Sequence, residues 1–202
     1  MFLKIHLSLA LLIVLALPVL AQQPAAPPLR IRGEITKVDG NMATVKTHGG
    51  DLVQVKLAEK VSVTGVKKAE FSEIVEGKFV GIASRPQADG SLLALEVLVF
   101  PEAARGSNEG HYPWDLAPDS MMTNANISAS VSAKNGRELT LTPKGQNVKI
   151  HVPEDVPVVT FAPGDRALLV PGAKVLVVAS KQADGSLLSP RVLVGIGITP
   201  PM

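Results

Sequence analysis

Cysteine is absent from this 202-residue chain, and aromatic residues make up only 3% of it. The lack of cysteine excludes disulfides and thiolate chemistry, so apolar burial alone must hold the fold together. The chain has one tryptophan and one tyrosine. This scarcity argues against single-stranded nucleic acid as a partner, because that binding mode needs aromatic side chains on which bases stack.

Net charge and long apolar runs are also scarce. The formal net charge is +2, and one unit of it belongs to Lys4 near the N-terminus. So weak a balance does not indicate a polyanionic partner. Beyond the first residues, no apolar run approaches the roughly 20 residues that a membrane-spanning helix needs. We therefore expect no transmembrane segment in the mature chain.

The first 21 residues have the pattern of a secretory signal peptide. Lys4 precedes an apolar run, Leu7–Leu17, Pro18 interrupts it, and Ala21 ends a small-residue cleavage pattern. We expect cleavage near Ala21 and a periplasmic or secreted protein that begins with a flexible Pro/Ala segment, residues 22–28.

One segment of the chain occurs twice. Residues 80–93, VGIASRPQADGSLL, return as residues 176–188, LVVASKQADGSLL, about 95 positions later. Such a match indicates two copies of one module. The Asp-Gly pairs common to both copies are explained as turn residues. Because the copies share no other chemistry-bearing group, the repeat favours a binding or scaffold role over catalysis.

Each copy has the pattern of a small β-barrel. Short stretches of alternating apolar and polar residues indicate half-buried strands, in the order of three strands, a short helix and two strands. That order in about 70 residues is typical of an OB-like barrel. Gly33 lies where the first strand of such a barrel must bend. An open two-sheet sandwich is the alternative.

The predicted organisation is therefore all-β, with two tandem OB-like barrels and an irregular connector. We expect the first barrel at residues 29–100, the connector at 101–126, the second barrel at 127–197 and a tail at 198–202. Within the first copy, residues 61–66 are predicted as a brief strand separate from residues 52–57.

The pattern also resembles a known family. The residues that carry the resemblance are Gly33, Val38–Gly40, Thr44–Val45, Phe71–Val80 and Asp89–Ala94. They resemble an exported bacterial OB-like domain family of unknown function, and the second copy departs from it at Ala129. The whole layout is similar to proteobacterial proteins labelled "metal ABC transporter permease". A permease needs several membrane-spanning helices, so this sequence contradicts that label. The resemblance supplies no catalytic residues.

The connector holds the most distinctive side chains. His111, Tyr112, Trp114 and Asp115 stand close together between the copies, and they include the only tyrosine and tryptophan. One interpretation is that the aromatic rings dock the connector onto both barrels. The other is a ligand or partner site at the junction, where pockets commonly form.

Metal binding is a weaker hypothesis. Histidine and methionine together would suit copper in an exported protein, and the candidate ligands are His48, His111, His151, Met121 and Met122. No two of the histidines stand at ligand spacing, so a specific metal site is not predicted. No nucleophile with its base and no phosphate-binding loop is present either.

The sequence thus predicts an exported, non-catalytic binding or scaffold protein of the cell envelope, without a cofactor. Its partner would be an unknown envelope protein or a small molecule, not nucleic acid. The alternative is a periplasmic metal-binding accessory protein linked to metal uptake.

Overall fold

The computed structural model describes residues 27–200. The predicted signal peptide, most of the Pro/Ala segment and the last two residues of the predicted tail lie outside the described residues.

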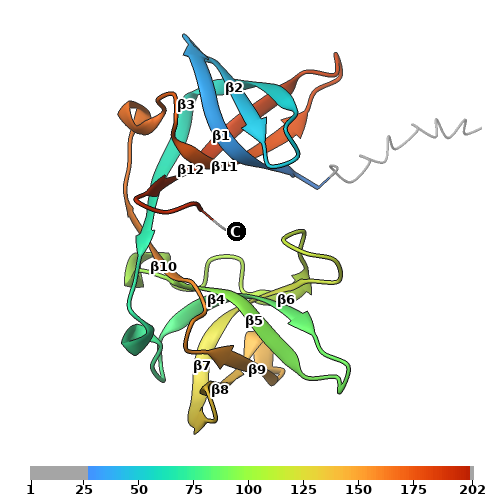
Figure 1. The fold of residues 1–202 in the computed structure, drawn as a ribbon, viewed down its shortest axis with the longest axis vertical. Coiled ribbons are helices and arrows are strands. Elements are labelled where there is room, and N and C mark those ends of the chain that lie inside the picture. The colour runs from blue at the N-terminus through green and yellow to red at the C-terminus, as the bar shows by residue number, and fades with distance from the viewer. Residues whose placement is uncertain (1–26, 201–202) are drawn as a thin grey trace, which may run out of the picture.

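Residues 27–200 form an all-β structure whose only helical segments are single 3-10 turns (Figure 1), as the sequence predicts for the fold class. The strands are β1 (Leu29–Asp39), β2 (Met42–Thr47), β3 (Leu52–Lys68), β4 (Phe79–Pro86), β5 (Leu92–Val99), β6 (Gly110–Pro113), β7 (Met121–Ala133), β8 (Gly136–Leu141), β9 (Val148–Pro153), β10 (Val158–Pro163), β11 (Lys174–Lys181) and β12 (Leu187–Ile196). The turns are η1 (Phe71–Glu73), η2 (Glu102–Ala104), η3 (Pro143–Gly145) and η4 (Arg166–Leu168). None of these helical segments is long and apolar enough to cross a membrane.

Five strands close into a barrel, which we call the first barrel. Their order is β1-β2-β3-β12-β11, and β11 pairs again with β1. Only the β3–β12 pair is parallel. Alternate residues of these strands point inward, as the period-two pattern predicts. The buried cluster includes Ile35, Val45, Val55, Leu57, Val63, Val175, Val177, Val192 and Val194.

Gly33 allows β1 and β2 to approach each other closely in this barrel. A Cβ atom added at Gly33 would lie 2.1 Å from the carbonyl oxygen of Lys46. No side chain fits there, which gives a steric reason for glycine inside a strand.

A second strand group contains β4, β5, β7, β8 and β9, and β10 pairs with both β3 and β5. β4 pairs with β5 and β7, β7 pairs with β8, and β8 pairs with β9. β9 meets β5 at a single pair, Leu93 with His151. This group has its own buried cluster, which includes Ile74, Val80, Ile82, Val97, Val99, Ile127, Leu139, Leu141, Ile150 and Val152. β6 is an extra strand that pairs with β7.

The grouping of strands differs from the prediction. Residues 29–100 do not close a barrel of their own, and neither do residues 127–197. Instead, β1, β2 and β3 of the first copy close with β11 and β12 of the second, whereas β4 and β5 of the first copy join β7, β8 and β9. Figure 1 shows the blue and cyan strands beside the orange and red ones. Two OB-like barrels, one from each copy, are not confirmed.

The continuity of β3 explains the difference. The sequence suggested two strands at 52–57 and 61–66, but Leu52–Lys68 is one strand of 17 residues. Its last part, Thr64–Lys68, runs antiparallel to Val159–Pro163 of β10. Because β3 does not turn back, it carries the chain out of the first barrel. The β4–β5 hairpin therefore forms in the second strand group.

A third apolar cluster lies between the first barrel and the second strand group. It contains Val66, Phe79, Leu98, Phe100, Val159, Leu176 and Leu193. Phe100 meets Phe79 and Phe161 edge to face, with ring centroids 5.2 and 5.6 Å apart. This cluster, which we call the junction cluster, holds the two parts of the molecule together and forms the base of the site described next.

Candidate functional site

The outer face of the first barrel presents two rows of side chains to the junction. Strand register places Val178 of β11 between Arg30 of β1 and Arg191 of β12. The next row on that face places Leu176 between Arg32 and Leu193. Side chains directly opposite on neighbouring strands lie on the same face. Two arginines therefore flank an apolar strip on this wall.

The opposite wall comes from the second strand group. Glu96, Leu98 and Phe100 occupy alternate positions at the end of β5, so they share a face, and Leu98 and Phe100 belong to the junction cluster. Val97 and Val99, between them, belong to the interior of the second strand group instead. One face of β5 thus packs in the interior of the second strand group, and its other face packs in the junction cluster.

The connector crosses the junction at its edge. β6 pairs with β7, with Tyr112 opposite Met122. The hydroxyl oxygen of Tyr112 accepts a hydrogen bond of 3.0 Å from the Nδ2 atom of Asn124. Its ring meets that of Trp114 edge to face, with centroids 6.1 Å apart. These contacts hold Tyr112 on the second strand group and place Trp114 beside the first barrel.

Trp114 and Asp115 then contact β1. The guanidinium carbon of Arg30 lies 3.8 Å from the centroid of the Trp114 ring. Asp115 accepts a 2.8 Å hydrogen bond from Arg32 and lies 3.8 Å from Arg30. Partial burial tends to raise the pKa of Asp115, but the hydrogen bond from Arg32 and the two positive charges lower it overall. Asp115 is therefore held as a carboxylate against the first barrel.

Between these walls lies an open cleft of about 890 Å³. Its base is apolar and formed by the junction cluster, and its rim carries the polar and cationic groups. Residues of both walls line it, including Arg30, Leu98, Phe100, Tyr112, Trp114, Phe161, Leu176, Val178, Arg191 and Leu193. Pockets that bind small molecules commonly have such a composition, with volumes of roughly 300–1,000 Å³.

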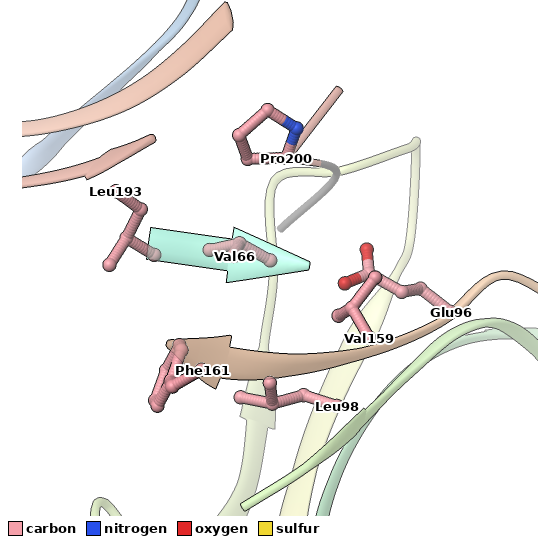
Figure 2. A pocket seen from close by; sticks show the side chains of 7 residues that line it. All are labelled: Val66, Glu96, Leu98, Val159, Phe161, Leu193 and Pro200. Atoms are coloured by element: carbon pink, nitrogen blue, oxygen red, sulfur yellow. The ribbon is translucent and has the colours of Figure 1, made fainter. Parts of the chain in front are cut away.

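A small cavity of about 10 Å³ adjoins the cleft, since Leu98, Phe161 and Leu193 line both. Figure 2 shows the carboxylate of Glu96 directed into the space that these side chains surround with Val66, Val159 and Pro200. Glu96 is fully buried, and neither of its oxygens has a hydrogen-bond partner within residues 27–200. Burial raises the pKa of Glu96 to about 8, although the charge of Arg32 opposes the shift.

Trp114 also has an unpaired polar atom. Its indole Nε1 is buried and has no hydrogen-bond partner in the described part of the chain. Buried donors normally have a partner, and those without one need an explanation. Trp114 lines the cleft with other atoms of its side chain, since Nε1 itself is buried.

The structure brings together three of the four predicted junction residues. Tyr112 and Trp114 line the cleft, and Asp115 anchors Trp114 beside it. His111 is exposed, and its Nδ1 lies 2.8 Å from the hydroxyl oxygen of Thr123 on β7. Partial burial lowers the pKa of His111. It therefore belongs to the β6–β7 pair rather than to the cleft lining.

The five candidate metal ligands are scattered. His48 lies in the turn before β3, and His151 on β9 pairs with Glu138, with Nδ1 and Oε1 2.6 Å apart. Met121 and Met122 are neighbours on β7, and Met122 lines the cleft. No group of three His, Cys, Asp or Glu residues that could hold a metal ion occurs within residues 27–200.

Sequence reasoning did not single out Arg30, Arg191 or Glu96. Arg30 and Arg191 lie about 160 positions apart, and only the pairing of β11 with both β1 and β12 makes them neighbours. Glu96 could have been noticed in the sequence, because it is the only polar residue within the apolar stretch Leu92–Phe100. A lone carboxylate in such a strand is seldom buried without a partner.

No protein-family model, curated protein or solved structure matches the chain.

Proposed function

We propose that this is an exported, non-catalytic binding protein of the cell envelope whose ligand occupies the cleft between the two parts of the molecule. In this proposal both parts are OB-like barrels, and the two copies have exchanged their last two strands. The parallel β3–β12 pair and the β5–β9 contact support that interpretation, because they close the two strand sets in the same order.

The cleft itself carries the proposal. Its volume of about 890 Å³ suits a small molecule, and its base offers aliphatic and aromatic side chains from both walls. Tyr112 and Trp114 contribute large, rigid contact surfaces at low cost in conformational entropy.

Binding rather than catalysis follows from the type of groups at the cleft. Aliphatic and aromatic side chains hold a ligand by contact, and the two arginines offer N–H donors that orient it. The location in the envelope rests on the signal-peptide pattern that ends at Ala21.

The experiment uses Trp114 as a reporter, since it is the only tryptophan. The protein is expressed with its leader in a Gram-negative host, recovered from the periplasm and stripped of lipid. It is then titrated with N-phenyl-1-naphthylamine, a neutral apolar dye that accepts energy from tryptophan. We expect saturable energy transfer from Trp114 to the dye.

Two variants locate the dye. Ala104→Phe places a ring in the cleft, because Ala104 lines it, and should weaken dye binding at least tenfold. Ala103→Phe is the matched control, since Ala103 is exposed on the same turn and should bind the dye as the natural protein does. Equal dye binding by both variants would reject the cleft as the site. Recovery of the protein only from the cytoplasm would reject the envelope location.

A further inference from the structure

Building on the proposed function, we infer that the cleft binds an amphipathic anion: a singly charged acidic head group lies between Arg30 and Arg191, and an aliphatic chain extends over the junction cluster. The ligand class is thus an acyl or alkyl chain that ends in a negative charge. The geometry of the two arginines and the apolar base together point to it.

The head-group site follows from strand register. Arg30 and Arg191 both lie opposite Val178, one on each neighbouring strand, and all three residues line the cleft. Guanidinium groups on either side of a small aliphatic residue leave room for an anion between them. Each arginine offers several N–H donors in a planar fork that matches a carboxylate or a phosphate.

The charges of this row are incompletely balanced. The guanidinium of Arg191 is exposed and forms no ion pair or hydrogen bond within residues 27–200. Arg30 stacks on Trp114, and its ion contact with Asp115 is long, at 3.8 Å. Asp115 forms its short hydrogen bond with Arg32 instead. Both guanidinium groups therefore have N–H donors that can bind an anion.

The acidic residue that lines the cleft belongs to the other wall. Glu109 also lines the cleft, but it lies on the connector, and its Oε1 accepts a 3.0 Å hydrogen bond from the backbone N–H of Lys144 in η3. This bond ties Glu109 to the second strand group. The positive side of the cleft is thus the wall of the first barrel, which sets the orientation of a charged ligand.

The chain site is the apolar base. Next to the arginine row, Leu176 and Leu193 present aliphatic side chains, and Leu98, Phe100 and Phe161 face them from the other side. Burial of an aliphatic chain on this base removes apolar surface from water, which favours binding. Beyond this base lies the cavity of Glu96, whose carboxyl group is neutral at pH 7 because burial raises its pKa to about 8. An uncharged acid there does not repel the anion.

The test compares ligands that share a chain or a charge. Dodecanoate is titrated below its micelle concentration by calorimetry and by displacement of the naphthylamine dye. Dodecanol has the chain without the charge, dodecyltrimethylammonium has the opposite charge, and acetate has the charge without the chain. Dodecyl phosphate tests a phosphate head against a carboxylate. We expect dodecanoate to bind at least tenfold more tightly than dodecanol, and acetate not to displace the dye.

Variants assign the head group to its site. Arg191→Met should weaken dodecanoate at least tenfold and leave dodecanol within twofold, while Arg191→Lys should retain part of the affinity. Arg191 is exposed, so its replacement leaves the fold intact. Arg85→Met is the control, because Arg85 is exposed near the end of β4 and does not line the cleft.

The outcomes separate this inference from the proposed function. Equal affinity for dodecanoate and dodecanol, or an unchanged affinity in Arg191→Met, would overturn the anion site, while dye binding sensitive to Ala104→Phe would keep the cleft as a binding site. Preference for dodecyltrimethylammonium would also overturn it. No binding of dye or dodecanoate would overturn both.

Discussion

The guanidinium of Arg30 lies 3.8 Å from the centre of the Trp114 ring, and this contact joins the two parts of the molecule. Arg30 belongs to β1 of the first barrel, whereas Trp114 follows β6, which is paired with β7 of the second strand group. The connector is therefore attached to one part through backbone pairing and to the other through side chains.

Replacing Trp114 should weaken this attachment without unfolding the protein. Trp114→Ala removes the cation–π contact, worth about 0.5–2 kcal/mol, and the ring contact with Tyr112. We expect a loss of about 1–3 kcal/mol in the free energy of unfolding, measured in urea by circular dichroism. Trp114→Phe keeps an aromatic face and should lose less than half as much. An alanine variant as stable as the natural protein would show that the contact does not stabilise the junction.

Glu96 should make stability depend on pH. Its pKa is about 8 in the folded protein and 4.5 in its ordinary state, so the folded state binds the proton more tightly. The contribution of Glu96 to the free energy of unfolding is therefore fully present below pH 4.5, and it decreases as the pH rises from 4.5 to 8. Each unit of pKa corresponds to about 1.4 kcal/mol, so the loss should reach several kcal/mol.

Urea unfolding at pH 5, 7 and 9 measures this dependence. Glu96→Gln should remove most of the decline between pH 5 and 9, because no charge is then buried. Glu96→Leu should in addition stabilise the protein, because it also removes the buried polar group that has no partner. Glu59→Gln is the control, since Glu59 is exposed. If the decline persists in Glu96→Leu, another group causes it.

Gly33 should tolerate no side chain. In Gly33→Ala the new Cβ atom would lie 2.1 Å from the carbonyl oxygen of Lys46, so β1 and β2 must separate. We expect a loss of about 2 kcal/mol or more, as for other forced backbone shifts. Gly49→Ala serves as the control, because its Cβ atom would meet the nearest atom at 3.6 Å, an ordinary contact. Thermal unfolding that ranks the two variants equally would contradict the steric argument.

The two fragments of a cut chain should stay associated, because strands from both copies pair with one another in both parts of the molecule. A protease site placed at Gly106–Ser107, in the exposed loop between η2 and β6, separates β1–β5 from β6–β12. Each fragment supplies strands to both the first barrel and the second strand group. The cleaved protein should therefore elute as one species in size-exclusion chromatography until denaturant is added. Two fragments that separate in native buffer would show that each copy folds alone.

Much of the local structure could be predicted from the sequence. Alternation at Val53, Val55 and Leu57 predicts a half-buried strand, and these residues lie in β3. Asp165 precedes the short turn at residues 166–168, as a capping residue does, and its carboxylate accepts a 2.8 Å hydrogen bond from the N–H of Ala167. Strand periodicity and capping depend on residues that are close in the sequence, so the sequence alone is enough to predict them.

The site was predicted only in part. Tyr112 and Trp114 drew attention because a connector has little need of large rings, and both line the cleft. Nothing in the sequence marked Arg191, since an exposed arginine after a proline in a strand is ordinary. Its role depends on lying opposite Val178, and thus on which strands are neighbours.

The amino-acid sequence by itself determined that the described chain is all-β, that it contains a repeated module, and which residues of each strand are apolar. The tertiary structure alone decided which strands meet. Both copies carry a similar alternation of apolar residues, so this alternation alone does not specify which hairpin completes which set of strands. The uninterrupted β3 carries the chain across the junction and selects the exchanged pairing. That pairing places Arg30, Val178 and Arg191 in one row and buries Glu96 beside the cleft.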